Sequence, residues 1–125
     1  MNILLAEDDS NISTIAIMAL EHFGGHKVTH VDNGLDALEA AKNGEFDVIV
    51  LDQMMPIMNG ITVSKEIKAN DNGKTPIIFL SAKCHPDDIS EFNNNGIGHI
   101  QKPFDPATLC EQIENLIRNI GIQVT

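Results

Sequence analysis

The sequence predicts an α/β domain built as a doubly wound, five-stranded parallel sheet. Short continuous apolar runs alternate along the chain with segments of helical periodicity. Apolar runs without polar alternation are typical of strands covered on both faces of a parallel sheet. The strongest runs are residues 3–6, 48–51 and 77–80, and weaker candidates for edge strands are 27–31 and 98–101.

The segments between these runs have apolar stripes typical of amphipathic helices. We expect Ser10 to cap the first helix and Gly24 with Gly25 to end it. The second helix stops at Asn43 and Gly44, and the third and fourth cover residues 61–70 and 86–94. The first stripe consists of Ile12, Ile15, Ala16, Ala19, Leu20 and Phe23, and the second of Leu35, Leu38 and Ala41. The fifth helix begins with Asp105 as its cap and Pro106 in its first turn, and is lined by Leu109, Ile113, Leu116, Ile117 and Ile120.

Alternation of five strands with five helices leaves few topologies once crossovers are right-handed. The expected strand order is 2-1-3-4-5, which places strands one and three side by side at the switch point. Ligands bind such sheets outside the carboxyl ends of the strands. The residues that follow each strand are therefore the candidates for function.

Composition narrows the classes of partner. The 125 residues form one expected domain, residues 1–125, with a formal net charge of −10. So acidic a surface makes nucleic acid and anionic membrane poor partners. No apolar run reaches the roughly 18 residues of a membrane-spanning helix, and the start has no basic region typical of a signal peptide. We expect a cytoplasmic protein, in which Cys84 and Cys110 are reduced, mostly buried thiols.

Acidic side chains gather where the predicted strands end. Strand one runs into Glu7, Asp8 and Asp9, and strand three ends in Asp52. Crowded carboxylates repel one another and favour binding of protons or a cation. An oxygen-only cluster in a wet cleft suits a hard divalent ion, of which Mg²⁺ is the expected one. An alternative for Asp9 is a capping role at the helix that follows.

The same edge carries a hydroxyl, Ser81 after strand four, and an ammonium, Lys102 after strand five. The acidic loop after strand one would repel a preformed phosphomonoester such as FMN. A carboxylate can itself attack phosphorus and become an aspartyl phosphate, with metal and lysine neutralising charge. Asp52 occupies the place that such a nucleophile needs.

These residues give the chain a resemblance to the response-regulator receiver domains of two-component signalling, which have a (βα)5, flavodoxin-like fold. The resemblance extends from residue 2 to about residue 120. It rests on Ile3-Leu4-Leu5-Ala6-Glu7-Asp8-Asp9, Asp32-Asn33-Gly34-Leu35-Asp36-Ala37-Leu38, Asp47-Val48-Ile49-Val50-Leu51-Asp52, Met54-Met55-Pro56-Ile57-Met58-Asn59-Gly60, Ser81-Ala82-Lys83 and Lys102-Pro103-Phe104. Each segment alone is weak, but together, in this order and spacing, they are strongly specific.

The resemblance implies a role for each acidic residue. Asp52 is expected to be phosphorylated. Mg²⁺ is expected to be held by Asp8, by Asp52 and by the backbone carbonyl of Met54, with Glu7 acting through water. Two residues outside this set, Ser81 and Lys102, are expected to contact the phosphoryl group once it is attached. The bond between Lys102 and Pro103 is expected to be cis.

Some positions depart from the commonest family pattern. His99 stands at the switch position three residues before the lysine, where Tyr or Phe is usual, and residues 96–98 read Gly-Ile-Gly. The switch is expected to involve Ser81 and His99 on a readout surface formed by the fourth helix, fifth strand and fifth helix. Lys83 near the site is read as a surface lysine. The other histidines are read as surface residues, namely His22, His26, His30 and His85.

The expected function is phosphoryl acceptance from a phospho-histidine of a sensor histidine kinase or phosphotransfer protein, followed by contact with a downstream protein target. This makes the chain a signalling protein that assists its own phosphorylation, as a monomer or weak phosphorylation-dependent dimer. Two alternatives stay open: a Mg²⁺-dependent phosphatase using an aspartyl phosphate, and a degenerate receiver that only binds partners. No output domain is expected after Thr125, so a stand-alone regulator, a relay intermediate and a receiver taken from a longer protein are all compatible.

Overall fold

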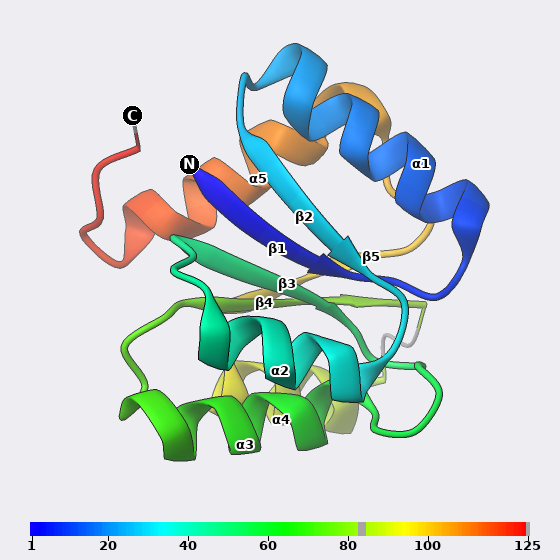
Figure 1. Cartoon of the computed structure of the whole chain (residues 1–125). Coiled ribbons are helices and arrows are strands. Elements are labelled where there is room, and N and C mark those ends of the chain that lie inside the picture. Colours follow the sequence, from blue (N-terminus) through cyan, green and yellow to red (C-terminus); the bar gives the residue numbers. More distant parts are fainter. Residues whose placement is uncertain (83–84, 125) are drawn as a thin grey trace.

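The computed structural model describes residues 1–82 and 85–124, and its centre is a parallel sheet with helices on both faces (Figure 1). The sheet has five strands in the order β2-β1-β3-β4-β5, as predicted. The strands are β1 (Asn2–Ala6), β2 (Lys27–Val31), β3 (Val48–Asp52), β4 (Ile77–Ser81) and β5 (Gly98–Gln101). The helices are α1 (Ser10–Met18), the π-helix η1 (Ala19–Phe23), α2 (Gly34–Asn43), α3 (Gly60–Asp71), α4 (Pro86–Asn95) and α5 (Pro106–Asn119).

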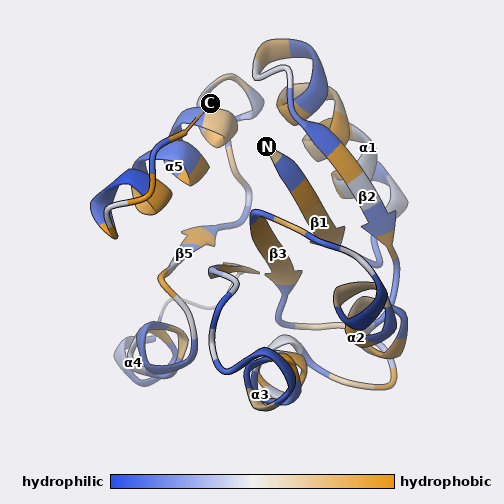
Figure 2. Ribbon diagram, turned by 60° about the vertical axis from the view of Figure 1, so that its left-hand side comes forward, coloured by the Kyte–Doolittle hydropathy of each residue, from blue (hydrophilic) through white to orange (hydrophobic). Residues whose placement is uncertain are grey.

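Apolar side chains of the central strands alternate between two cores. One face of the sheet packs against α1, η1 and α5, and the other packs against α2, α3 and α4. Every residue of β3 and of β4 is buried, as expected for strands covered on both faces. Figure 2 shows this arrangement, with the central strand β3 hydrophobic and the helices around the sheet carrying hydrophilic residues. The edge strand β2 is largely exposed, which explains its weaker sequence signal.

Parallel pairing brings all the strand ends to one edge. Leu51 pairs with Ala6 on β1 and with Phe79 on β4, and Ser81 pairs with Gln101 on β5. The residues that directly follow these pairs therefore emerge together. In Figure 1 the arrowheads of β1, β2 and β3 point to the same side of the molecule.

The start and end of the first helix differ from the prediction. Asp9, not Ser10, is the cap, because its carboxylate accepts hydrogen bonds from the N–H groups of Asn11 (2.9 Å) and Ile12 (3.2 Å). The helix then widens into η1 before Gly24. Ile15 and Phe23, predicted to be core residues, are exposed. For Phe23 the reason is the π-helical turn, which changes the helical period from Ala19 onwards.

The remaining helices lie within one residue of their predicted limits. Asp105 caps α5 by accepting a hydrogen bond from Ala107 N–H (2.9 Å), with Pro106 in the first turn. Ile120, expected to line this helix, lies just after its last residue and is exposed. Among the described residues no helix is long and apolar enough to cross a membrane.

Candidate functional site

Three carboxylates meet at the carboxyl edge of the sheet. Glu7 and Asp8 follow β1, and Asp52 is the last residue of β3. One carboxylate oxygen from each lies within 4.8 Å of the others, although Glu7 and Asp52 are buried while Asp8 is exposed. The convergence predicted from the strand ends is thus present, with one face open to solvent through Asp8.

Lys102 supplies the positive charge within this cluster. Its Nζ lies 2.5 Å from Oε1 of Glu7 and 3.0 Å from Oδ1 of Asp52. The lysine side chain is 14% exposed, and the two carboxylate side chains are 0% and 4% exposed. The lysine follows β5, and its peptide bond to Pro103 is cis, as predicted. Because the two carboxylates are buried and little of the lysine side chain is exposed, water screens the attraction between Lys102 and the two carboxylates only weakly, and the charge of each group depends strongly on the other two.

Burial and crowding change the proton affinities of the cluster. Burial raises the pKa of Glu7 from 4.5 to about 7, with Lys102 opposing the shift and Asp52 adding to it. Burial by itself would lower the pKa of Lys102, but its contacts with both carboxylates outweigh that effect and raise it. A single lysine does not neutralise three acids, so the site favours a further cation.

The donor set fits a hard divalent cation. All three side chains offer oxygen, and the fully buried Oε1 of Glu7 is paired with the Lys102 ammonium. Oxygen-only sites with an open, solvent-facing side suit Mg²⁺, which retains several waters when bound. The predicted magnesium ligands Asp8 and Asp52 are therefore placed together.

Backbone groups hold the buried carboxylates in place. Oε2 of Glu7 accepts a hydrogen bond from Asp9 N–H (3.2 Å), and its carbonyl oxygen lies 2.9 Å from Nε2 of His30. Oδ1 of Asp52 accepts from Met54 N–H (3.3 Å). Asp9 belongs to the loop but not to the acidic cluster, since its carboxylate caps α1.

Ser81 is buried at the end of β4, one strand away from Asp52. Its carbonyl oxygen accepts a hydrogen bond from Lys102 N–H (2.9 Å), which ties the ends of β4 and β5 together. Met54 has an exposed side chain, and its backbone carbonyl stays a predicted magnesium ligand. Lys83, read from the sequence as a surface residue near the site, lies outside the described residues, as does Cys84.

Two residues that support the site were not identified from the sequence. Oε1 of Gln53 accepts a hydrogen bond from Ile61 N–H (2.9 Å), so this side chain links the end of β3 to the first turn of α3. A Cβ on Gly60 would lie 2.8 Å from the carbonyl oxygen of Asp52, so only glycine allows α3 to begin so close to β3. Neither contact has a local sequence signal, because both depend on how the loop folds back.

His99 belongs to an aromatic stack that crosses three elements. Its ring lies on Phe92 of α4 (centroids 5.9 Å apart, 30° between planes), and Phe92 lies on Phe79 of β4 (5.0 Å, 26°). Phe79 and Phe92 are fully buried, while His99 is half-buried. The predicted switch residue is therefore packed against α4 on one side and reaches solvent on the other.

The prediction that His26 lies on the surface is wrong. Its side chain is 3% exposed, and Nε2 lies 2.8 Å from Oε2 of Glu114 on α5. The reason is tertiary: the turn between η1 and β2 lies against α5, which no local pattern indicates. His22, His30 and His85 are exposed, as predicted, and Cys110 is a buried free thiol, also as predicted.

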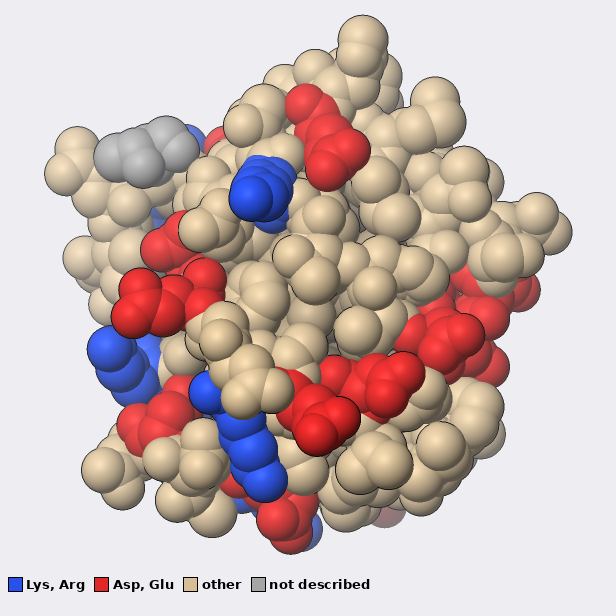
Figure 3. Space-filling view, viewed as in Figure 1, with Lys and Arg blue, Asp and Glu red and all other residues tan. Residues whose placement is uncertain are grey.

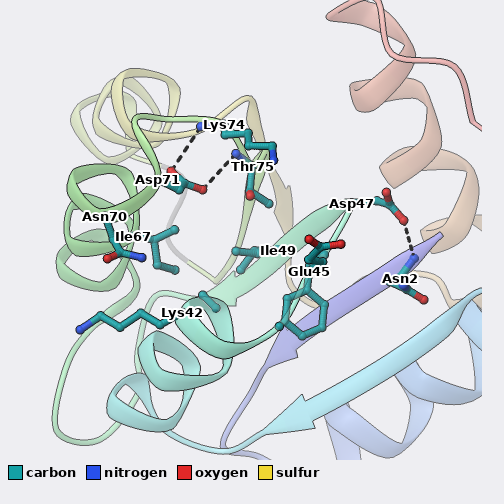
Figure 4. Close-up of a pocket in the computed structure, with 13 residues that line it drawn as sticks. Asn2, Lys42, Glu45, Asp47, Ile49, Ile67, Asn70, Asp71, Lys74 and Thr75 are labelled. Atoms are coloured by element: carbon teal, nitrogen blue, oxygen red, sulfur yellow. Dashed lines mark hydrogen bonds between the residues drawn. The ribbon is translucent and has the colours of Figure 1, made fainter.

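A hollow of about 410 Å³ lies at the opposite, amino edge of the sheet (Figure 4). Two of its three acidic side chains already have structural partners: Asp47 accepts from Asn2 N–H (2.7 Å), and Asp71 accepts from Lys74 N–H (3.2 Å) and Thr75 N–H (3.2 Å). This hollow lacks the convergence of unneutralised acids found at the carboxyl edge, so it is not the candidate site.

The acidic surface predicted from composition is visible in Figure 3, where Asp and Glu side chains spread over the face shown and Lys and Arg are few. The net charge of −10 raises the local concentration of cations around the whole molecule. A cation-binding edge on such a surface gains from this long-range attraction.

The pKa of Glu7 predicts how stability depends on pH when no divalent ion is bound. The folded protein holds more protons than the unfolded chain between pH 4.5 and about 7, so the free energy of unfolding falls as pH rises through this window. The loss is about 3 kcal/mol. Urea denaturation of the wild type and of Glu7→Gln, without divalent ions, should give curves that diverge across this range. Parallel curves would contradict the assignment.

Comparison with known proteins identifies the family. The model of the response regulator receiver domain matches residues 3–114. The chain is 34% identical over 122 residues to chemotaxis protein CheY-3 of Vibrio cholerae, covering 96% of this chain and 94% of that protein. It is 37% identical over 118 residues to the probable transcriptional regulator ycf29 of Porphyra purpurea, covering 93% of this chain and 56% of that longer protein.

Comparison with solved structures identifies the same family. The chemotaxis protein CheY4 of Vibrio cholerae has a TM-score of 0.84 at 29% identity, with 92% of this chain and 97% of that one covered. The receiver domain of a sensor histidine kinase from Pseudomonas aeruginosa, with magnesium coordinated in its active-site cleft, has a TM-score of 0.80 at 33% identity, with 97% and 98% covered. With its predicted fold and its cluster of acids and lysine in place, the chain belongs to the response-regulator receiver domains of two-component signalling.

Proposed function

We propose that Asp52 accepts a phosphoryl group from a phospho-histidine of a partner kinase or phosphotransfer protein. The observation that carries the proposal is the position of its carboxylate, buried at the end of β3, 3.0 Å from Lys102 Nζ and beside Glu7 and Asp8. A nucleophile for phosphoryl transfer needs neighbouring positive charge and a defined position more than any further covalent chemistry. Its oxygen attacks phosphorus, and the electrons of the breaking bond leave with the partner's imidazole nitrogen.

Asp8, Asp52 and the backbone carbonyl of Met54 are the proposed magnesium ligands, with Glu7 acting through water. The bound ion would neutralise charge on the transferring phosphoryl oxygens. The exposed side chain of Asp8 leaves this side of the site open to solvent and to a donor. Glu7 is held inside by Lys102 and Asp9 N–H, which suits an indirect role better than a direct one.

Lys102 and Ser81 are proposed to respond to the modification. Lys102 is paired with Asp52 before transfer, and the added phosphoryl oxygens give its ammonium a stronger anion to contact. Ser81 lies at the end of the neighbouring strand, and its carbonyl is already joined to Lys102 N–H. Interactions gained only in the modified state shift the balance between two arrangements of β4 and β5.

The readout surface is proposed to be α4, β5 and α5, with His99 within it. The stack from Phe79 of β4 through Phe92 to His99 gives a continuous packed contact from the site strand to this surface. Receiver domains interact with histidine kinases and with downstream targets. We propose both kinds of partner here, with the chain acting as a monomer or as a phosphorylation-dependent dimer.

The receiver family does not favour the phosphatase alternative, in which the nucleophile would follow strand one. The degenerate alternative is a receiver that only binds partners. It predicts that the chain takes up no phosphoryl group, whereas we predict that it does. We propose a signalling protein rather than an enzyme acting on a released substrate, working in the cytoplasm.

The test is uptake of a phosphoryl group from acetyl phosphate, read by intact mass with and without Mg²⁺. We expect a mass increase of one phosphoryl group, lost when Mg²⁺ is chelated. Asp8→Asn should raise the Mg²⁺ concentration for half-maximal uptake by roughly 10–100-fold, because it removes one anionic ligand. The matched control is Asp9→Asn, whose carboxylate caps α1 and should leave the Mg²⁺ requirement unchanged. Absence of any adduct on the wild type would favour the degenerate alternative.

A further inference from the structure

A second group of metal-ligating side chains lies away from the phosphoryl site, between the start of β2 and α5. Nε2 of His26, Sγ of Cys110 and a carboxylate oxygen of Glu114 lie within 4.8 Å of one another. Cys110 and Glu114 are one helical turn apart on α5, and His26 comes from the turn after η1. Sequence spacing alone does not reveal this set, because His26 is 84 residues or more from the other two.

The three side chains are already organised around one carboxylate. Oε2 of Glu114 lies 2.8 Å from Nε2 of His26 and accepts a hydrogen bond from the thiol of Cys110 (3.1 Å). Its other oxygen, Oε1, faces the guanidinium of Arg118 (3.4 Å). Arg118 thus contacts one oxygen of Glu114, while the other oxygen contacts both the imidazole and the thiol.

The backbone makes room for this arrangement. A Cβ on Gly24 would lie 2.4 Å from Cys110 Sγ and 2.7 Å from the ring of His26, so a larger residue would exclude the pair. The φ of Gly24 is −97°, which any residue adopts, so the requirement here is space. The π-helix η1 ends directly at this glycine, and π-helical turns often occur at functional sites.

The donors match the preferences of zinc. One imidazole nitrogen, one sulfur and one carboxylate oxygen form a set that zinc binds tetrahedrally, with water in the fourth position. One thiolate and one carboxylate together neutralise its double positive charge. Hard ions such as Mg²⁺ avoid sulfur and imidazole, so this set discriminates against the ion proposed for the acidic cluster.

The two contacts to Oε2 of Glu114 have the length of hydrogen bonds, and they need to lengthen only slightly to accommodate a metal ion. Tetrahedral zinc with bonds of about 2.0–2.3 Å separates its ligand atoms by roughly 3.3–3.6 Å. The observed 2.8 and 3.1 Å contacts would lengthen by a few tenths of an ångström to about half an ångström. Glu114 is partly exposed, which gives an ion a path to the buried thiol and imidazole.

We propose that His26, Cys110 and Glu114 form a zinc-binding site that clamps α5 to the start of β2. Zinc would replace the thiol proton of Cys110 and the proton on Nε2 of His26. The neutral imidazole would then carry a proton on Nδ1, which lies 2.9 Å from the N-terminal amino group of Met1; that group would give up one proton to Nδ1 and accept the hydrogen bond as a neutral amine. Without metal, burial and the hydrogen bond to Glu114 raise the pKa of Cys110 to about 11, so the thiol is protonated and poorly reactive. The site goes beyond the proposed phosphoryl chemistry, because it offers a second input that acts on α5, part of the proposed readout surface.

The test uses the full chain, reduced with a non-thiol reductant and kept in excess Mg²⁺ to occupy the acidic cluster. Co²⁺ is added as a spectroscopic substitute and then displaced by Zn²⁺. We expect one equivalent of Co²⁺ to produce near-ultraviolet thiolate charge-transfer absorption that Zn²⁺ removes. Zn²⁺ should also raise the Tm, since it binds the folded chain.

Variants assign the signal to these residues. Cys110→Ser should abolish the thiolate absorption and weaken Zn²⁺ binding by at least about 100-fold, while the matched control Cys84→Ser should retain both. Glu114→Gln should retain the thiolate absorption with weaker binding, and circular dichroism verifies folding. Absence of thiolate absorption in the wild type, or its persistence in Cys110→Ser, would overturn the proposal. Phosphoryl uptake by Asp52 is measured separately, so either proposal can fail alone.

Discussion

Asp52→Asn should abolish phosphoryl uptake while leaving the fold intact. The amide has the shape of the carboxylate and its oxygen can still accept the hydrogen bond from Met54 N–H, but it is not a nucleophile toward phosphorus. We expect the mass adduct formed with acetyl phosphate and Mg²⁺ on the wild type to be absent from the variant. Samples taken over time from the same incubation compare the rate of phosphoryl uptake between the wild type and the variant.

Stability separates this result from simple misfolding. Asp52 raises the pKa of Glu7, so removing its charge relieves repulsion inside the site. The free energy of unfolding of Asp52→Asn should therefore equal or exceed that of the wild type. The matched control is Asp47→Asn, directly before the same strand, where the side chain accepts a hydrogen bond from Asn2 N–H at the far edge of the sheet. An adduct on Asp52→Asn equal to that on the wild type would refute the assignment of the phosphoryl acceptor.

Lys102→Met should cause the largest loss of stability among single changes in the site. The substitution retains length and apolar volume but removes the only ammonium within 4 Å of the buried Glu7 and Asp52 among the described residues. Removing one partner of a buried ion pair costs about 3–5 kcal/mol, because the remaining charge is left uncompensated. Urea denaturation near neutral pH, without divalent ions, measures the loss.

Two conditions should reduce that loss. Near pH 5 Glu7 is protonated in the folded protein, so the free energy of unfolding should differ less between variant and wild type than at pH 7. Added Mg²⁺ should restore part of the stability at pH 7, since the bare carboxylates attract it. Lys42→Met, a change of the same kind on the exposed side of α2, should alter stability by less than about 0.5 kcal/mol. A loss independent of both pH and Mg²⁺ would indicate a packing effect instead.

Local sequence patterns determined the framework of this protein. The apolar runs at β1, β3 and β4 predict buried parallel strands because a strand covered on both faces has no polar side to show. Chain connectivity and the handedness of crossovers then place the strand ends together. The acidic edge with Asp52 at its centre follows from these rules, before any contact is known.

Tertiary packing decided what local patterns do not encode. The burial of His26 depends on α5, which lies 80 residues or more further along the chain and supplies Glu114 as its partner. The support of the site by Gln53 depends on a loop folding back onto α3, and the cap of α1 depends on which of two adjacent polar residues points at the helix. The physical reason is the separation of the residues along the chain. Local periodicity shows which face of one helix or strand is apolar, whereas the pairing of polar groups from distant elements depends on how those elements pack.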